Sequence, residues 1–432
     1  MKDVYVDDLL TDNAAGSTVT IKGWVYRIRE QKNLVFIVLR DHTDQIQCVV
    51  HKDNVNESTW ELANDLYQES AVTITGELEE DERAPTGYEI SVDELDGEPG
   101  EPFPIQEHQS KEFLNDNRHL WLRSQDMTDT MKIRHAVFQA IRSYFNDEGF
   151  YEFHSPMFQS TQAEGGSELF EVPYFDDTMY LSQTWQLPAE AGVTSLEKIY
   201  TIAPSFRAEK SKTSRHLTEY WHAEMEVAWN TFEDIQDYGE ALIKHVVDHV
   251  TSEHEDELER LGRNPDELQA TITEDFPRMT YTEALDVLDE ECDIDVRWGE
   301  DLGRHEEGAL TELYNTPIIV TNYPKEAKAF YMKEVPDNPD AVQGCDFLAP
   351  EGYGEIIGGS QREADIEEIK RRLRDDGEDP ADYDYYLDTR RYGSVPHGGF
   401  GLGVERLIAW VCGLDTVRDT IPFPRTVNRT HP

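Results

Sequence analysis

Apolar and β-branched residues alternate with polar ones in short runs over the first hundred positions of the chain. Five such runs are separated by turn-forming residues, and a helical pattern over residues 58–67 follows the third of them. The runs cover residues 19–26, 34–39, 46–50, 71–76 and 88–92. Five short strands with one intervening helix predict an all-β barrel of the OB-fold type, whose outer face often binds single-stranded nucleic acid.

From Met127 onward the pattern changes, and helices and strands alternate irregularly. In order, these are a helix at 133–145, strands around Tyr180 and Tyr200, an acidic helical region at 232–261, and strands at 317–320 and 354–358. This order is not a repeating βαβ pattern, so it predicts an α+β domain with a mainly antiparallel sheet. We expect an OB-fold domain at 1–100, a hinge rich in proline, glycine and charge at 101–125, and the α+β domain at 126–432.

A glycine-rich run near the end of the chain carries the first chemical signal. Glycines at every second position from Gly399 to Gly403 let a strand lie flat against a ligand, because there is no Cβ to hold it off. The run ends on Arg406, where an apolar helix is expected to begin, and a planar guanidinium there suits phosphate. By itself the pattern is also typical of an ordinary strand–turn–helix junction.

A second segment, far upstream, favours the ligand-binding interpretation. Arg207 and Glu209 are two positions apart, so on a strand they share one face. The polar stretch 209–214 indicates a loop, and an aromatic-rich strand is expected at 220–229, with Glu224 and Glu226 again two positions apart. Two strands joined by a loop, with charged residues on one face, make a platform for a polar ligand. The alternative is an ordinary hairpin with surface ion pairs of little energetic worth.

Together these segments resemble the motifs of class II aminoacyl-tRNA synthetases. Phe206-Arg207-Ala208-Glu209 with Arg215-His216-Leu217 matches motif 2, and the run from Gly401 to Arg406 matches motif 3. Phe153-His154-Ser155-Pro156 is similar to motif 1, whose proline lies at the dimer interface in the family. The resemblance therefore implies a homodimer with Pro156 at its interface.

Net charge changes this picture in one respect. The chain has 89 acidic and 39 basic residues and a formal charge of −50, whereas an RNA-binding protein ordinarily has a basic surface. Near 1 M salt the Debye length falls to about 3 Å, which screens the repulsion of a polyanion. Acidic proteins of this kind are typical of halophilic archaea. A hydrophobic fraction of 38% excludes an acidic disordered protein.

Several other classes are excluded by what the sequence lacks. The four cysteines (Cys48, Cys292, Cys345 and Cys412) are scattered and indicate neither a disulfide framework nor a metal cluster. No apolar run reaches about 18 residues and no leader is recognisable, so we expect a cytoplasmic protein without a membrane partner. A P-loop sequence is absent, which excludes that mode of phosphate binding. The resemblance to the synthetases implies tRNA, and not DNA, as the nucleic-acid partner.

The resemblance implies a site for ATP and Mg²⁺. In it Arg207 and Arg406 are the catalytic residues, which hold the phosphates, and Glu355 is the metal ligand. The other ATP-binding residues that it implies are Glu209, Arg215, His216, Leu217, Tyr220 and Gly403. The serine that helps to hold Mg²⁺ in aspartyl enzymes is replaced by Gly358 here, and Ser360 is a candidate substitute.

Four further segments are similar to the asparaginyl branch of the family. They are residues 322–331, 355–363, 391–397 and 421–426. Aspartyl enzymes carry a lysine, which pairs with the substrate β-carboxylate, at the position of Ala189, and here Glu190 follows it. Losing a cation and adding an anion favours asparagine, whose carboxamide can donate to Glu190 and accept from Arg362. The resemblance also implies that Glu164 receives the substrate ammonium and that Gln186 and Arg207 contact the amino acid. The alternative for Glu190 is a solvated helical residue with no contact to the substrate.

In the predicted barrel, Arg29, Phe36 and Gln47 are candidates for reading the anticodon. Gly23-Trp24-Val25, Phe36 and Leu39-Arg40-Asp41 match the anticodon-binding domain of aspartyl and asparaginyl enzymes, in which the phenylalanine stacks on a base. The alternative for Phe36 is a residue of the barrel core.

The expected activity is ATP-dependent attachment of asparagine to tRNA(Asn) through an asparaginyl-adenylate. An aspartyl-tRNA synthetase is the nearest rival. A second rival is a tRNA-independent asparagine synthetase, but such relatives lack the anticodon module, so the predicted barrel argues against it. A third is an RNA-binding protein whose partner domain has decayed. The intact Arg207, Glu355 and Arg406 argue against that, because a decayed site should have lost some of them.

Overall fold

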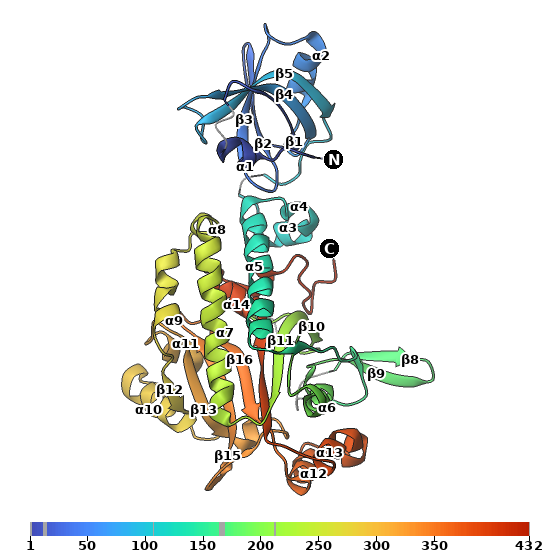
Figure 1. The fold of residues 1–432 in the computed structure, drawn as a ribbon, viewed down its shortest axis with the longest axis vertical. Coiled ribbons are helices and arrows are strands. Elements are labelled where there is room, and N and C mark those ends of the chain that lie inside the picture. Colours follow the sequence, from blue (N-terminus) through green and yellow to red (C-terminus); the bar gives the residue numbers. More distant parts are fainter. Residues whose placement is uncertain (1, 12–14, 107, 164–168, 211–212, 432) are drawn as a thin grey trace. The chain divides into compact units, whose positions relative to one another are not determined.

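The fold is that of a computed structural model, which describes residues 2–11, 15–106, 108–163, 169–210 and 213–431 (Figure 1). The chain divides into two compact units, Met1–Asn115 and Asp116–Pro432. No helix of the described residues is long and apolar enough to cross a membrane. The four cysteines are all free thiols.

The first unit is a closed five-stranded barrel with the strand order β1-β2-β3-β5-β4. Its strands are β1 (Thr18–Gln31), β2 (Leu34–Arg40), β3 (Gln45–His51), β4 (Ala71–Glu80) and β5 (Tyr88–Glu98), with helices α1 (Val6–Thr11) and α2 (Glu57–Asp65). Alternate residues face inward, so that Val35, Ile37 and Leu39 of β2 are fully buried while their neighbours are half-exposed. The five strands and the helix predicted from the alternation are confirmed.

The second unit is an α+β domain, as predicted. Its helices are α3 (Lys111–Asp116, which spans the boundary), α4 (Arg118–Trp121), α5 (Gln125–Asp147), α6 (Gln186–Leu196), α7 (Phe232–Glu253), α8 (Glu255–Arg260), α9 (Gln269–Thr273), α10 (Tyr281–Cys292), α11 (Arg304–Thr311), α12 (Ile366–Asp375), α13 (Asp384–Arg391) and α14 (Val404–Val411). Arg118 is buried and donates to the carbonyls of Arg418, Ile421 and Pro422, which ties α4 to the C-terminal segment.

Nine strands of the described residues form the main sheet, in the order β12-β13-β15-β16-β17-β11-β10-β6 with β14 beside β15. They are β6 (Tyr151–Glu152), β10 (Lys198–Phe206), β11 (Glu219–Ala228), β12 (Arg278–Thr280), β13 (Ile318–Pro324), β14 (Glu334–Val335), β15 (Asn338–Ala349), β16 (Gly354–Gln361) and β17 (His397–Gly403). Only the β12–β13 and β10–β6 pairings of this described sheet are parallel, so the sheet is mainly antiparallel, as predicted.

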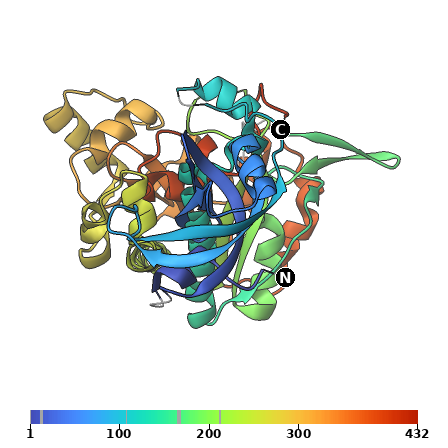
Figure 2. The ribbon, with the colours of Figure 1, turned by 90° about the horizontal axis from the view of Figure 1, so that it is seen from above.

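A smaller sheet is made of β7 (Phe158–Gln159), β9 (Asp177–Leu181) and β8 (Glu171–Tyr174), in that order. The hairpin of β8 and β9 projects from the second unit in both views (Figure 1 and Figure 2). Its tip carries Phe175, whose side chain is 92% exposed.

The core of the second unit lies between the main sheet and the helices α5, α7 and α14. Apolar residues recur every three or four positions along α5, and Ile133, Val137 and Ile141 are buried there. They share one cluster with Ile243 of α7 and Trp410 of α14, together with buried residues of the central strands. The central strands β11, β16 and β17 are therefore held rigidly, and they carry the site described next.

Candidate active site

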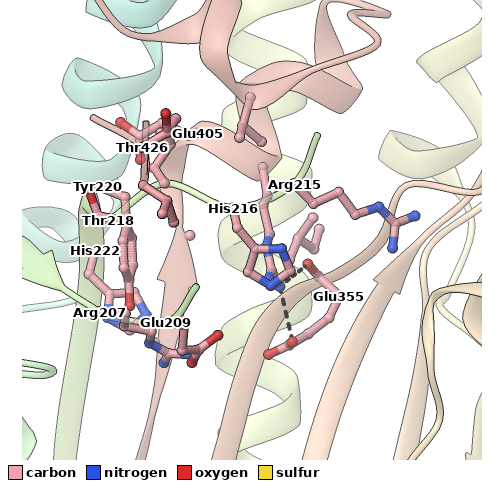
Figure 3. Close-up of a pocket in the computed structure, with 17 residues that line it drawn as sticks. Arg207, Glu209, Arg215, His216, Thr218, Tyr220, His222, Glu355, Glu405 and Thr426 are labelled. Carbon is pink, nitrogen blue, oxygen red and sulfur yellow. Dashed lines mark hydrogen bonds and ion pairs between the residues drawn. The ribbon is translucent and has the colours of Figure 1, made fainter. Parts of the chain in front are cut away.

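All nine residues predicted to bind ATP line one pocket at the ends of four neighbouring strands, β16, β17, β11 and β10. The segment between β10 and β11 contributes Arg207, Glu209, Arg215, His216 and Leu217, and β11 contributes Tyr220. Glu355 comes from β16, and Gly403 and Arg406 come from the β17–α14 junction. In Figure 3 Arg207 and Tyr220 lie on one side of this pocket, and His216 and Glu355 on the other. We call it the nucleotide pocket.

One local expectation is wrong. Strand β10 ends at Phe206, so Arg207 and Glu209 lie beyond the strand and not on its face. The Arg207 N–H still donates to the Thr218 carbonyl at 3.1 Å, which closes the hairpin before the chain turns away. The guanidinium consequently lies at the mouth of the hairpin, where it lines the nucleotide pocket and a second pocket beside it.

The alternate glycines of β17 make room for side chains of the neighbouring strand β11. These strands pair antiparallel, with Glu224 opposite Gly401 and Glu226 opposite Gly399. A Cβ on Gly401 would lie 2.4 Å from His222 Nε2. The glycines thus serve the packing of β11 as well as the approach of a ligand.

Replacing Gly399 by alanine is expected to lower the free energy of unfolding by about 1–3 kcal/mol. The new Cβ would lie 2.0 Å from the Met225 carbonyl oxygen, which cannot move without displacing β11. Gly308→Ala in α11 is the matched control, because nothing lies within 4 Å of its added Cβ. A helical Gly→Ala change is expected to stabilise by roughly 0.5–1 kcal/mol. Urea unfolding of both variants checks the prediction, and equal effects would contradict it.

Arg406 and Glu355 form an ion pair across the nucleotide pocket. Arg406 Nη1 donates to the Glu355 carbonyl at 2.9 Å and to Glu355 Oε2 at 3.0 Å. Burial acts to raise the pKa of Glu355, but Arg406, Lys328 and Arg207 outweigh it and hold the pKa at about 2. Glu355 is therefore a carboxylate at any physiological pH, with three cations around it.

The second pocket, of about 410 Å³, lies on the other side of Arg207. Arg207, His222, Glu355 and Gly401 line both pockets, so the two meet at these residues. The second pocket is also lined by Gln186, Glu226, Arg362, Lys328 and Asp346. Gln186 and Arg362 were predicted to bind the amino acid, and the structure brings them together here.

Glu226, which the sequence placed on the charged face of strand β11 without a role of its own, is a residue of the second pocket. Arg362 Nε donates to Glu226 Oε1 at 3.0 Å, and Arg362 Nη2 donates to the same oxygen. Glu226 Oε2 is buried and has no hydrogen-bond partner among the described residues. Burial raises the pKa of Glu226 to about 7, with Arg362 opposing and Glu190 reinforcing the shift. A buried acceptor on the wall of a pocket is suited to a donor on a ligand.

Glu190 lies behind this wall and does not line the pocket, contrary to its predicted contact with the substrate. Its side chain is fully buried, so the alternative of a solvated helical residue is also wrong. Its carboxylate accepts from Arg390 Nη2, from His397 Nε2 at 2.9 Å and from Gln186 Nε2 at 2.9 Å. Burial acts to raise the pKa of Glu190, but Arg390 and His397 hold it well below its usual value. Glu190 therefore orients Gln186 rather than meeting a ligand.

Two carboxylates converge on Gly358, the position where aspartyl enzymes have a serine. A Cβ on Gly358 would lie 3.0 Å from Glu355 Oε1 and 3.6 Å from Asp346 Oδ1. The other oxygens are occupied, since Glu355 Oε2 meets Arg406 and Asp346 Oδ2 accepts from Lys328 at 2.6 Å. Asp346 was not predicted from the sequence. Ser360 is fully buried and its Oγ accepts from Arg362 Nη1 at 2.6 Å, so it does not face these carboxylates.

The other predicted residues do not belong to the lining of either pocket or are not described. Glu164 is outside the described residues, and Pro156 is exposed. On the outer face of the barrel, the Arg29 guanidinium lies 5.0 Å from the centre of the Phe36 ring, and Gln47 Nε2 donates to Glu89 Oε2 at 2.8 Å. Phe36 is half-exposed and outside the barrel core, so the core alternative for it is wrong.

Comparison with known proteins gives matches over nearly the whole chain. Residues 110–427 match the family model described as tRNA synthetases class II (D, K and N), and residues 19–96 match that of the OB-fold nucleic acid binding domain. The asparagine–tRNA ligase of Thermoplasma acidophilum is 47% identical over 428 residues, which are 99% of each chain. The crystal structure of asparaginyl-tRNA synthetase from Pyrococcus horikoshii complexed with asparaginyl-adenylate matches with a TM-score of 0.96 and 44% identity, over 100% of both chains. The aspartyl-tRNA synthetase of Entamoeba histolytica gives a TM-score of 0.86 and 26% identity, over 100% of this chain and 93% of the other.

Proposed function

The chain belongs to the class II tRNA synthetases (D, K and N), among the asparagine–tRNA ligases, and from this premise we propose how its residues carry out the reaction. The enzyme attaches asparagine to tRNA with ATP, through an asparaginyl-adenylate. Arg207 lines both pockets, and this observation supports the roles assigned below. ATP and asparagine must react where the two pockets meet, which is where Arg207 lies.

In the first step a carboxylate oxygen of asparagine attacks the α-phosphorus of ATP. The new bond is an acyl–oxygen–phosphorus bond, and the bond from the α-phosphorus to the bridging oxygen breaks, with its electron pair leaving on pyrophosphate. No proton moves, because the attacking group is already an anion. The enzyme must therefore supply alignment and positive charge. Arg207 meets the α-phosphate and the substrate carboxylate, and Arg406 meets the γ-phosphate. In the second step a hydroxyl oxygen of the terminal tRNA ribose bonds to the acyl carbon, the bond from that carbon to the AMP oxygen breaks, and AMP leaves on its phosphate while the hydroxyl proton is lost to solvent.

The adenosine is held by the rest of the nucleotide pocket. Tyr220 and Arg406 provide a planar ring and a planar guanidinium between which adenine can stack. Glu209 and His216 orient the nucleotide, and burial together with Arg406 lowers the pKa of His216, which keeps its ring neutral.

The side chain of asparagine is recognised by Glu226 and Arg362. The Glu226 oxygen that has no partner accepts from the carboxamide N–H, and Arg362 donates to the carboxamide oxygen. Three of the five Arg362 N–H groups are used by Glu226 and Ser360, so two remain for the substrate. An aspartate side chain offers no donor to Glu226 and brings a second negative charge beside it, which disfavours the rival aspartyl activity.

The residues present fit Mg²⁺. Glu355 Oε1 and Asp346 Oδ1 face the same open position at Gly358, and Mg²⁺ prefers one or two carboxylates together with phosphate oxygens. These two residues would hold the ion, which neutralises charge on the phosphates when bound. Glu164 is proposed to receive the substrate ammonium.

The outward-facing Arg29, Phe36 and Gln47 support anticodon binding by the barrel, because single-stranded nucleic acid stacks on aromatic rings beside basic groups. The exposed Pro156 supports a homodimer, together with the exposed rings of Tyr151 and Phe158 near it. The charge of −50 supports work in a cytoplasm of high ionic strength.

Pyrophosphate exchange with ATP, run with each of the twenty amino acids from 0.1 to 3 M KCl, tests the function. We expect exchange with asparagine alone, increasing with salt. Exchange that requires aspartate, or none at any salt concentration, would contradict the proposal.

A further inference from the structure

A third cavity adjoins the nucleotide pocket, and none of the roles above uses it. It measures about 180 Å³, and Arg215 and Arg406 line it as well as the nucleotide pocket. Its remaining wall comes from α11, α14 and the segments 351–353 and 414–417, and includes Arg304, Asp415 and Thr416. We call it the arginine cavity, because three arginines face it.

Two of the three arginines are positioned by contacts behind them. Arg215 Nη1 donates to Glu307 Oε2 at 3.2 Å, and Arg406 is held by Glu355. The Arg304 side chain is exposed, and no ion pair or hydrogen bond joins it to any described residue. Burial lowers the pKa of Arg215, and the charges of Arg304 and Arg406 lower it further against the effect of Glu307. Three guanidinium groups this close repel one another unless an anion lies between them.

Two carboxylates line the cavity, Glu351 and Asp415. Glu351 is taken by Arg263, whose Nη1 and Nη2 each donate to it at 2.7 Å. Glu307 and Glu355, which pair with Arg215 and Arg406, lie outside the cavity lining, so Arg304 is the arginine whose charge is left for a ligand. A compact polyanion with several oxygens suits such a set, because each guanidinium can give it two parallel hydrogen bonds.

We propose that the arginine cavity binds the pyrophosphate product and is its route out of the enzyme, with Arg304 as the outer ligand. This rests on the proposed function. When the bond from the α-phosphorus to the bridging oxygen breaks, the leaving group lies on the side of Arg406, away from Arg207 and the second pocket. Arg215 and Arg406 border both spaces, so pyrophosphate passes from one to the other without losing its positive partners. Arg304 then takes up the outer phosphate, and Asp415 limits how tightly the product is held.

Arg304→Gln tests this through pyrophosphate itself. In exchange, the KM for pyrophosphate is expected to rise about 10-fold or more, which corresponds to the loss of one hydrogen bond between charged groups, while the KM values for ATP and asparagine change less than twofold. Inhibition of aminoacylation by added pyrophosphate weakens by the same factor. Arg304→Lys keeps the charge and is expected to recover most of the affinity.

The matched control is Arg297→Gln, because Arg297 is exposed on the segment before α11 and does not line the cavity. Titration calorimetry with pyrophosphate and no ATP gives a second readout, in which binding weakens for Arg304→Gln and not for the control. An unchanged KM for pyrophosphate, or an equal rise in the KM for ATP, would overturn the proposal. A parent enzyme without asparagine-dependent exchange would instead refute the proposed function.

Discussion

Replacing Arg406 by alanine is expected to lower asparagine-dependent pyrophosphate exchange by about 10³-fold or more. An arginine that meets the transferring phosphates contributes about 10³ to 10⁵ in rate in comparable phosphoryl sites. Arg406 is rigidly presented, because it follows the strand β17 at the start of α14 and is fixed by two hydrogen bonds to Glu355. Among the groups that lower the pKa of Glu355, Arg406 has the largest effect, so the pKa of Glu355 is expected to rise in Arg406→Ala.

Arg406→Lys separates charge from geometry, because an ammonium keeps the charge but not the planar fork. We expect it to restore only part of the lost rate. Arg371→Ala, an exposed arginine of α12 paired with Glu368, is the control for removing an arginine elsewhere. Circular dichroism and thermal unfolding establish that each variant is folded. Exchange by Arg406→Ala within tenfold of the parent would mean that Arg406 does not stabilise the reacting phosphates.

Sequence periodicity was sufficient for the barrel because each strand has one buried face. The alternation of Val35, Ile37 and Leu39 with polar neighbours is the direct result of that burial. It was not sufficient for the order of strands in the main sheet, where β17 lies between β16 and β11 although β11 is far upstream. That order depends on contacts between distant segments, which no local pattern records.

The residues expected to bind ATP could be named one by one from the sequence because they belong to compact motifs, and the structure brings them to one pocket. The lining of the second pocket was harder to predict, since its chemistry depends on which side of an element faces inward. Glu190 follows Ala189 directly, yet α6 turns it toward Arg390 and His397 and away from the pocket. The spacing of Glu224 and Glu226 placed Glu226 on a charged strand face, but not beside Arg362, because that partner is distant in sequence. Asp346 was missed, since its pairing with Lys328 depends on how β15 packs.

Glu226→Gln is expected to reduce the preference for asparagine over aspartate by about 10²- to 10³-fold, through a lower kcat/KM for asparagine and a higher one for aspartate. Changing one member of a buried charged pair typically costs 3–5 kcal/mol, and a site built for one hydrogen-bonding side chain strongly rejects its near-isostere. Glutamine keeps the size of Glu226 but removes the charge that repels the aspartate carboxylate. Glu253→Gln, at the exposed end of α7, is the matched control. Exchange with each amino acid measures the ratio.

The preference of the parent enzyme is also expected to depend on pH, in a direction fixed by Glu226. Burial raises the pKa of Glu226 to about 7, so the group is an acid at lower pH and a carboxylate at higher pH. The neutral acid can donate to an aspartate side chain, whereas the carboxylate only accepts and repels it. The ratio of kcat/KM for asparagine to that for aspartate should therefore rise between pH 6 and pH 8, and Glu226→Gln should lose this rise. A rise that survives in Glu226→Gln would assign the discrimination to another titrating group.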